Sequence, residues 1–233
     1  MIKTILSILF FSFLLSTDNP DFSASRPGNT NPSSTLAKGH FMFEGGTDLI
    51  NDFDSYIQLR YGLLKKIEVS ILQPIDSSAT AVSGSASIAF SIINGTKILP
   101  ALGLYVTAND FSDFKDISFY LPFSFSLPQD YNIGGQIGTS TDINHMSYSI
   151  YFGKNLNRKV WTFIEIYGML NINDNQENSD YLYPAFDCGI TYMVKENFQL
   201  DMNVGLPFTG EDISSNTQPY LQFGAAWMFP FNN

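Results

Sequence analysis

The sequence predicts an all-β protein: an up-and-down antiparallel transmembrane β-barrel of about 12 strands that follows an N-terminal signal peptide. Three observations predict this class. Apolar and polar residues alternate with a period of two over segments of about ten residues, the length that a tilted strand needs to cross a membrane. Short and long connections alternate along the chain. Charged residues make up only 15% of the 233 residues, against roughly 25% in soluble domains, and aromatic residues make up another 15%.

The first 24 residues are expected to form a signal peptide and short leader, and residues 25–233 to form the barrel. Lys3 supplies a positive charge, and the apolar run Ile5–Leu15 is too short to span a bilayer. The alternative is a buried N-terminal helix. No later stretch reaches the roughly 18 apolar residues of a membrane helix, so a membrane-embedded mature chain has to be a barrel. We therefore predict export to the outer membrane of a Gram-negative bacterium.

The strands are predicted where the alternation is regular. The clearest segments are 53–61, 87–92, 117–127, 146–152, 198–206 and 220–229. Within 117–127, apolar residues from Ile117 to Leu127 share one face, and the other face is mostly serine. That second face includes Pro122, which cannot donate to the strand ladder. Pro122 is therefore a candidate lateral kink, read either as a tolerated bulge or as a weak point through which an apolar solute leaves the lumen.

The connections alternate between tight turns and longer polar loops. We place them near 49–52, 63–66, 74–80, 94–97, 109–116, 128–130, 141–145, 155–159, 172–182, 195–197 and 208–217. Short periplasmic turns alternating with longer outer loops are typical of bacterial outer-membrane barrels with both termini in the periplasm.

The lumen is expected to carry the charges of the strands, because a charge facing lipid costs a few kcal/mol. Because alternate residues of a strand share a face, the positions opposite the apolar face point into the lumen. The lumen or pore-lining candidates are therefore Glu44, Arg60, Glu68, Glu165, Asp187 and Asp201. Arg60 and Glu68 flank the turn at 63–66 and are expected to face each other. Many other inward positions are serine or glycine, Gly134, Gly138 and Gly205 among them. Small residues favour a narrow pore; alternatively, they only accommodate strand curvature.

The last strand carries a candidate assembly signal. Gly224, Trp227 and Phe229 fall in a polar–x–Gly–x–x–aromatic–x–aromatic pattern that resembles the terminal-strand signal read by barrel assembly machinery. The expected partners are that machinery, outer-membrane lipids and small-molecule solutes.

Composition excludes several other functions. Lys and Arg number 12 against 22 Asp and Glu, and a net charge of −10 argues against nucleic-acid binding. One cysteine excludes an intramolecular disulfide framework, and two histidines, His40 and His145, leave little room for a His-rich metal site, so no metal site is predicted. No cofactor and no catalytic residue is predicted. Two alternatives to a channel remain. One is a barrel enzyme acting on lipids, for which His145 and Ser147 are a Ser/His pair close together in the sequence. The other is a structural or adhesion barrel with acidic outer loops.

Three blocks of the chain resemble a known family. Ala24–Thr30 with Lys38–Gly46 is similar to its amino-terminal signature. Leu59–Leu63 with Ile67–Val69 is similar to its second and third strands, and Gly189–Tyr192 with Phe198–Asp201 to its penultimate hairpin. The family is the outer-membrane transporter group named after the MetA pathway of phenol degradation, and the resemblance spans about residues 24–229. It departs at Ser25, where the family often has an acidic residue. The resemblance implies a transporting barrel with apolar or aromatic cargo and no catalytic residues.

Overall fold

The computed structural model describes residues 22–50, 55–75, 84–110, 116–141, 145–171, 185–207 and 218–230. Most of the predicted signal peptide lies outside these residues, and so does much of several longer loops. Within the described ranges, no helix has the length and apolar character needed to span a membrane.

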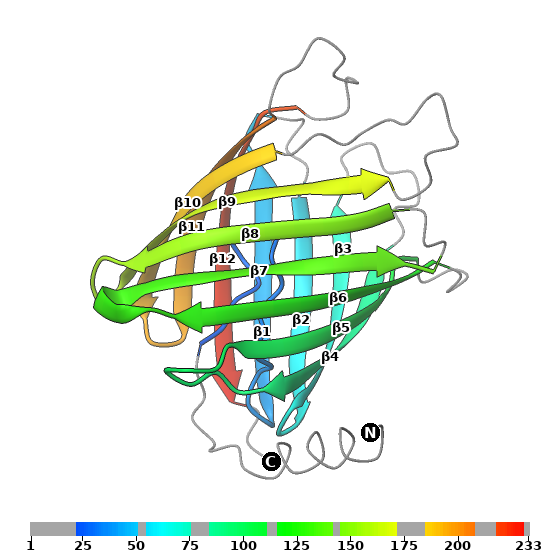
Figure 1. Cartoon of the computed structure of the whole chain (residues 1–233), viewed down its shortest axis with the longest axis horizontal. Helices are drawn as coiled ribbons and strands as arrows, with labels where there is room; N and C mark the ends of the chain where they lie inside the picture. The colour runs from blue at the N-terminus through cyan, green and yellow to red at the C-terminus, as the bar shows by residue number, and fades with distance from the viewer. Residues whose placement is uncertain are drawn as a thin grey trace.

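Twelve antiparallel strands form one closed barrel, which confirms the predicted fold class (Figure 1). Each strand pairs with the next along the chain, and β1 closes the barrel against β12. The strands are β1 (His40–Asp48), β2 (Ser55–Leu64), β3 (Ile67–Ile75), β4 (Ser85–Ile93), β5 (Ala101–Ala108), β6 (Ile117–Ser126), β7 (Tyr131–Ser140), β8 (His145–Asn155), β9 (Val160–Asn171), β10 (Ala185–Lys195), β11 (Phe198–Pro207) and β12 (Tyr220–Pro230). One short 3₁₀ turn, Pro128–Asp130, joins β6 to β7.

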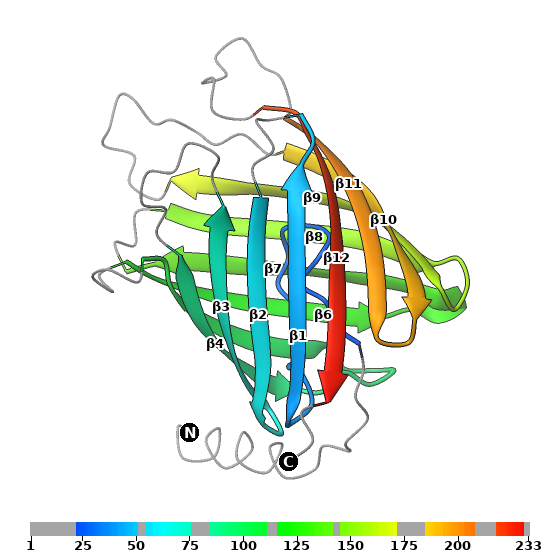
Figure 2. The same ribbon diagram turned by 180° about the vertical axis from the view of Figure 1, so that it is seen from behind.

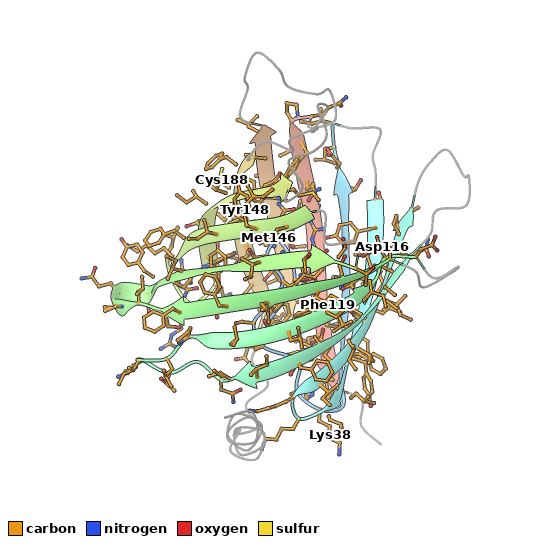
Figure 3. All side chains as sticks on the ribbon, turned by 45° about the vertical axis from the view of Figure 1, so that its right-hand side comes forward. Lys38, Asp116, Phe119, Met146, Tyr148 and Cys188 are labelled. Atoms are coloured by element: carbon orange, nitrogen blue, oxygen red, sulfur yellow. The ribbon has the colours of Figure 1, made fainter. Side chains whose placement is uncertain are left out.

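The eleven connections fall within a few residues of the predicted positions. Five of them, at 65–66, 94–100, 127–130, 156–159 and 196–197, lie at one end of the barrel, which we call the short-turn end. The strand register shifts beside three of these turns, after Gly62, Ser91 and Met193. In Figure 3, Lys38 lies at the end where β1 begins and Asp116 at the opposite end, just before β6.

The two faces of the wall differ as the alternation predicts. On β11, Met202, Val204 and Leu206 point outward and are exposed, whereas Asp201 and Asn203 point inward and are buried. Phe119, Met146 and Tyr148 lie on the front wall in Figure 3. Outward aromatic side chains stack near the short-turn end, with Phe41 4.5 Å from Tyr61 and 6.0 Å from Phe229 between ring centroids. An apolar outer band with aromatic rings at its edge is typical of a barrel that sits in lipid.

Inward glycines of the wall do not leave open space. A Cβ atom at Gly134 would lie 2.6 Å from the ring of Tyr151, and Cβ atoms at Gly138 and Gly205 would overlap the rings of Tyr120 and Tyr220. Each ring lies over the glycine of a neighbouring strand. The expectation that these small residues open the lumen is therefore not met at the three glycines, because aromatic side chains fill the space above them.

A segment that precedes the first strand lies inside the barrel. We call residues 22–39 the lumen segment. It has no strand structure, and Figures 1 and 2 show it, in dark blue, between the β1–β2–β12 wall and the opposite wall of β6–β8. The predicted barrel domain, residues 25–233, thus begins with a stretch that fills the lumen rather than with a strand.

Candidate functional site in the barrel lumen

Arg60 is the centre of one buried ion-pair cluster. Its Nε and Nη2 atoms donate to the two carboxylate oxygens of Glu68 at 2.6 and 3.0 Å, and its Nη1 donates to Glu44 at 2.7 Å. All three side chains are at most 1% exposed. The structure brings Arg60 and Glu68 together as predicted, but not directly opposite. Arg60 pairs with Ser70, and Glu68 pairs with Gly62, so the two side chains meet diagonally across the hairpin.

The lumen segment completes the hydrogen bonding of this cluster. Ser23 accepts from Arg60 Nη1 through its backbone carbonyl at 2.7 Å. The backbone N–H and hydroxyl of Ser25 donate to Glu44, and the backbone N–H of Leu36 donates to Glu68 at 2.8 Å. Leu36 packs with Met42, Ala226 and Met228 in a small apolar core inside the lumen. The candidate pore-lining residues of this side therefore bind a segment of their own chain.

Arg26 of the lumen segment forms a second buried ion pair, with Asp201. Arg26 Nη2 lies 2.9 Å from Asp201 Oδ1, and both side chains are buried. Its guanidinium also donates to the Tyr56 hydroxyl. The group lies over Gly46 and Gly224, which face each other on β1 and β12, and a Cβ at either position would overlap it. Two paired glycines thus form the slot for this arginine.

Asn29 and Thr30 reach the remaining two carboxylates. The Asn29 backbone N–H donates to Glu165 at 2.6 Å, and its side-chain amide donates to Asp187 at 3.3 Å. The Thr30 hydroxyl also donates to Glu165. Tyr220 donates its hydroxyl to Asp187 at 2.7 Å. Glu165 and Asp187 are directly opposite each other on β9 and β10, and no ion pair to either appears among the residues that the structure describes.

Further along, polar side chains of the wall hold the segment at β6 and β7. The Asn31 backbone N–H donates to the Gln136 amide oxygen at 2.9 Å, and the hydroxyls of Ser33 and Ser124 are 2.7 Å apart. Ser124, which the alternation predicts to face the lumen, thus contacts the lumen segment.

A cavity of about 180 Å³ remains between the lumen segment and the wall. The lumen segment lines one side through Arg26, Thr30 and Asn31. Four aromatic residues of the wall, together with Ser124 and Glu165, line the other side: Phe123, Tyr151, Trp161 and Phe163. The rings of Trp161 and Phe163 stack at 5.0 Å with an interplanar angle of 12°, and Tyr151 meets Trp161 edge-on. The cavity therefore combines an apolar aromatic surface with hydrogen-bonding groups.

Pro122 points into the lumen and is buried. It pairs with Gln136 of β7, but the ladder between β5 and β6 has no pairs at Leu121 and Pro122, and it resumes in the same register on either side. The position is a local gap in pairing without a bulge. A Cβ at the facing Gly103 would lie 3.0 Å from the Ser33 carbonyl oxygen, so the lumen segment covers this gap from inside.

The other sequence candidates are placed as follows. Gly224 faces inward under Arg26. Trp227 and Phe229 face outward, and their ring centroids are 5.8 Å apart. Ser147 lies on β8 close to Gly138, and the side chain of His145 is outside the described residues. His40 has its Nδ1 3.3 Å from the Lys38 carbonyl. Within the described ranges, no group of three or more His, Cys, Asp or Glu side chains forms a metal site.

Sequence periodicity does not predict the lumen segment. Arg26 stands out in the sequence only as part of the family resemblance, although the predicted lumen holds five carboxylates and one arginine. Buried carboxylates need cationic or hydrogen-bonding partners, so that imbalance was the available signal for a second arginine.

Among the comparisons with known proteins, only the comparison with solved structures finds matches. No family model matches the chain, and no curated protein matches it. Among solved structures, the chain is similar to the KdgM porin, with a TM-score of 0.59 at 9% identity, covering 82% of this chain and 99% of the other. It is also similar to the NanC porin, with a TM-score of 0.55 at 10% identity over 80% and 98% of the two chains. These likenesses show the shared barrel fold.

Proposed function

We propose that the protein is an outer-membrane channel for passive passage of small solutes, in which the lumen segment forms the constriction. The observation that carries the proposal is the distribution of polarity on a closed wall. Ion-paired and hydrogen-bonded side chains face the lumen, and an apolar band with aromatic rings near the short-turn end faces outward. This arrangement suits a membrane-embedded barrel with a polar path, and the porin folds to which it is similar support that assignment.

The proposed location is the outer membrane of a Gram-negative bacterium, reached through the signal peptide predicted in residues 1–24. On this proposal, outer-membrane lipids contact the outward face, and barrel assembly machinery reads the last strand at Gly224, Trp227 and Phe229. Recovery of the folded chain in the soluble periplasm would contradict the location.

The cargo that we propose is a small solute with an apolar or aromatic part. The family resemblance implies such cargo, and the stacked rings of Trp161 and Phe163 beside the cavity offer a surface of the matching kind. Arg26 and Arg60 lie among five buried carboxylates, Glu44, Glu68, Glu165, Asp187 and Asp201, so these side chains leave an excess of negative charge. That excess disfavours anionic solutes.

Conductance of the refolded protein in a planar bilayer tests the proposal. We expect small, discrete, ohmic steps and a reversal potential that favours cations. The double variant Arg26→Ala/Asp201→Ala removes one anchor of the lumen segment without leaving a buried charge unpaired, and it should give larger steps. Trp227→Phe, on the outer face, is the matched control and should not change the steps.

Two other outcomes of the conductance measurement would replace the channel proposal with another function. A silent barrel that hydrolyses phospholipid would be an enzyme, and a silent barrel without that activity would support a structural or adhesion role. Neither alternative is favoured by a specific contact among the described side chains.

A further inference from the structure

The buried carboxylates of the lumen differ in the charge of their hydrogen-bond partners. Glu44 and Glu68 are paired with Arg60, and Asp201 with Arg26. Glu165 and Asp187 are as deeply buried, at 1% and 0% exposed, but their hydrogen bonds come from neutral groups: Asn29, Thr30 and Tyr220. Two carboxylates that face each other across adjacent strands, away from bulk water, can both stay ionised only if a positive charge lies between them or beside them; otherwise one of them takes up a proton.

Two buried oxygen atoms at this place have no hydrogen-bond partner. They are Oδ1 of Asp187 and Oδ1 of Asn203. Asn203 lies on β11, diagonal to Asp187 on the inner face, and its amide reaches the Asp187 carboxylate. It is only 3% exposed. Unpartnered buried oxygens are costly, and the Asn203 oxygen belongs to a neutral side chain beside Asp187, so it is an observation separate from the acidic pair itself.

We propose that a small cation binds at Glu165, Asp187 and Asn203. The donor set consists of oxygen atoms only, which suits a hard cation such as Na⁺ or Ca²⁺. The cation offsets the repulsion of the two carboxylates and uses the oxygen atoms that the protein leaves unpartnered. One of the three ligands, Glu165, also lines the cavity between the lumen segment and the wall.

Binding at this site would also fix the lumen segment. Asn29 and Thr30 donate to the same carboxylates, so a cation that orders Glu165 and Asp187 orders their contacts with residues 29–30. The site does not depend on conduction. A barrel that fails to conduct can still bind the cation, so the two proposals fail separately.

The test is thermal unfolding of the detergent-solubilised full chain during titration with CaCl₂ or NaCl. Tetramethylammonium chloride at equal ionic strength is the reference, because it screens charge but is too large and too weak a ligand for three protein oxygens. We expect CaCl₂ or NaCl to raise the apparent unfolding temperature by about 3 °C or more above the reference at saturation. Calorimetric titration should give one site per chain.

Asp187→Asn and Glu165→Gln keep the shape and remove one charge. We expect each to be more heat-resistant than the wild type without added cation, and to lose the specific response to CaCl₂ or NaCl. Asp201→Asn is the matched control. It removes a lumen carboxylate that already has Arg26 as partner, so it should lower heat resistance and keep the cation response.

Three results would overturn the proposal. The first is a wild-type chain whose unfolding temperature depends on ionic strength alone. The second is an equal cation response in Asp187→Asn and in the wild type. The third is a response to tetramethylammonium as large as that to the metal cations and lost in Asp187→Asn, which would assign the site to an organic ammonium group instead.

Discussion

At the scale of single residues, burial decides how much the lumen charges contribute. Parity alone predicts that Arg60 and Glu68 lie in the lumen, and an exposed cross-strand pair of this kind contributes about 0.2–1 kcal/mol. In the structure, the pair is bidentate, and both side chains are at most 1% exposed because Ser23 and Leu36 cover them. Sequence periodicity cannot show that cover, since it comes from a segment outside the strands.

A double-mutant cycle measures this pair. We expect Arg60→Ala to destabilise the barrel by about 3–5 kcal/mol, because it leaves Glu44 and Glu68 buried without their cation. Arg60→Ala/Glu68→Ala should be destabilised by less than the sum of the two single variants, with a coupling energy of about 1–3 kcal/mol from urea unfolding in detergent. Additive single effects would show that the two side chains do not interact.

At the scale of strands, the packing of rings over glycines determines how full the lumen is. Alternation predicts which residues face inward, and it succeeds along β6, β8, β11 and β12. It does not predict that the inward glycines are covered, because the covering rings come from neighbouring strands whose register is not readable from one sequence. Tyr220 over Gly205 is one such contact.

Alanine substitution separates a covered glycine from an open one. Gly205→Ala should lower stability by about 1–3 kcal/mol, because the new methyl group would overlap the Tyr220 ring. Gly45→Ala is the matched control on an outward position of β1, where a Cβ has its nearest neighbour at 3.4 Å. It should change the free energy of unfolding by less than about 0.5 kcal/mol. Equal losses of stability at both glycines would contradict the packing of the Tyr220 ring over Gly205.

Pro122 offers a test of lateral exit through the wall. Pro122→Val supplies an N–H donor where the β5–β6 ladder has a gap, so heat resistance should rise. If apolar solutes leave through this gap, the variant should also slow uptake of an apolar aromatic compound while passage of a small polar solute is unchanged. Equal effects on both solutes, or no effect on either, would leave only an axial path.

At the scale of the whole molecule, the sequence predicts the barrel well and its contents poorly. Strand number, order and the eleven connections follow from period-two alternation and loop length, because a membrane-sized strand has a fixed length and two different faces. The lumen segment has no such period. Residues 22–39 are fixed by contacts distant in sequence, such as Arg26 with Asp201, which a single sequence does not reveal.

Residues 22–39 lie in the lumen, and a designed disulfide tests this placement most directly. The hydroxyls of Ser33 and Ser124 are 2.7 Å apart, so Ser33→Cys/Ser124→Cys, in a Cys188→Ser background, should form an intramolecular disulfide in the folded barrel under mild oxidation. Ser33→Cys/Phe125→Cys, whose second cysteine faces outward, should not. Mass spectrometry and thiol labelling report the bond. Cysteines at 33 and 124 that stay reduced and react with a polar maleimide in the folded protein would contradict the placement of residues 22–39 in the lumen.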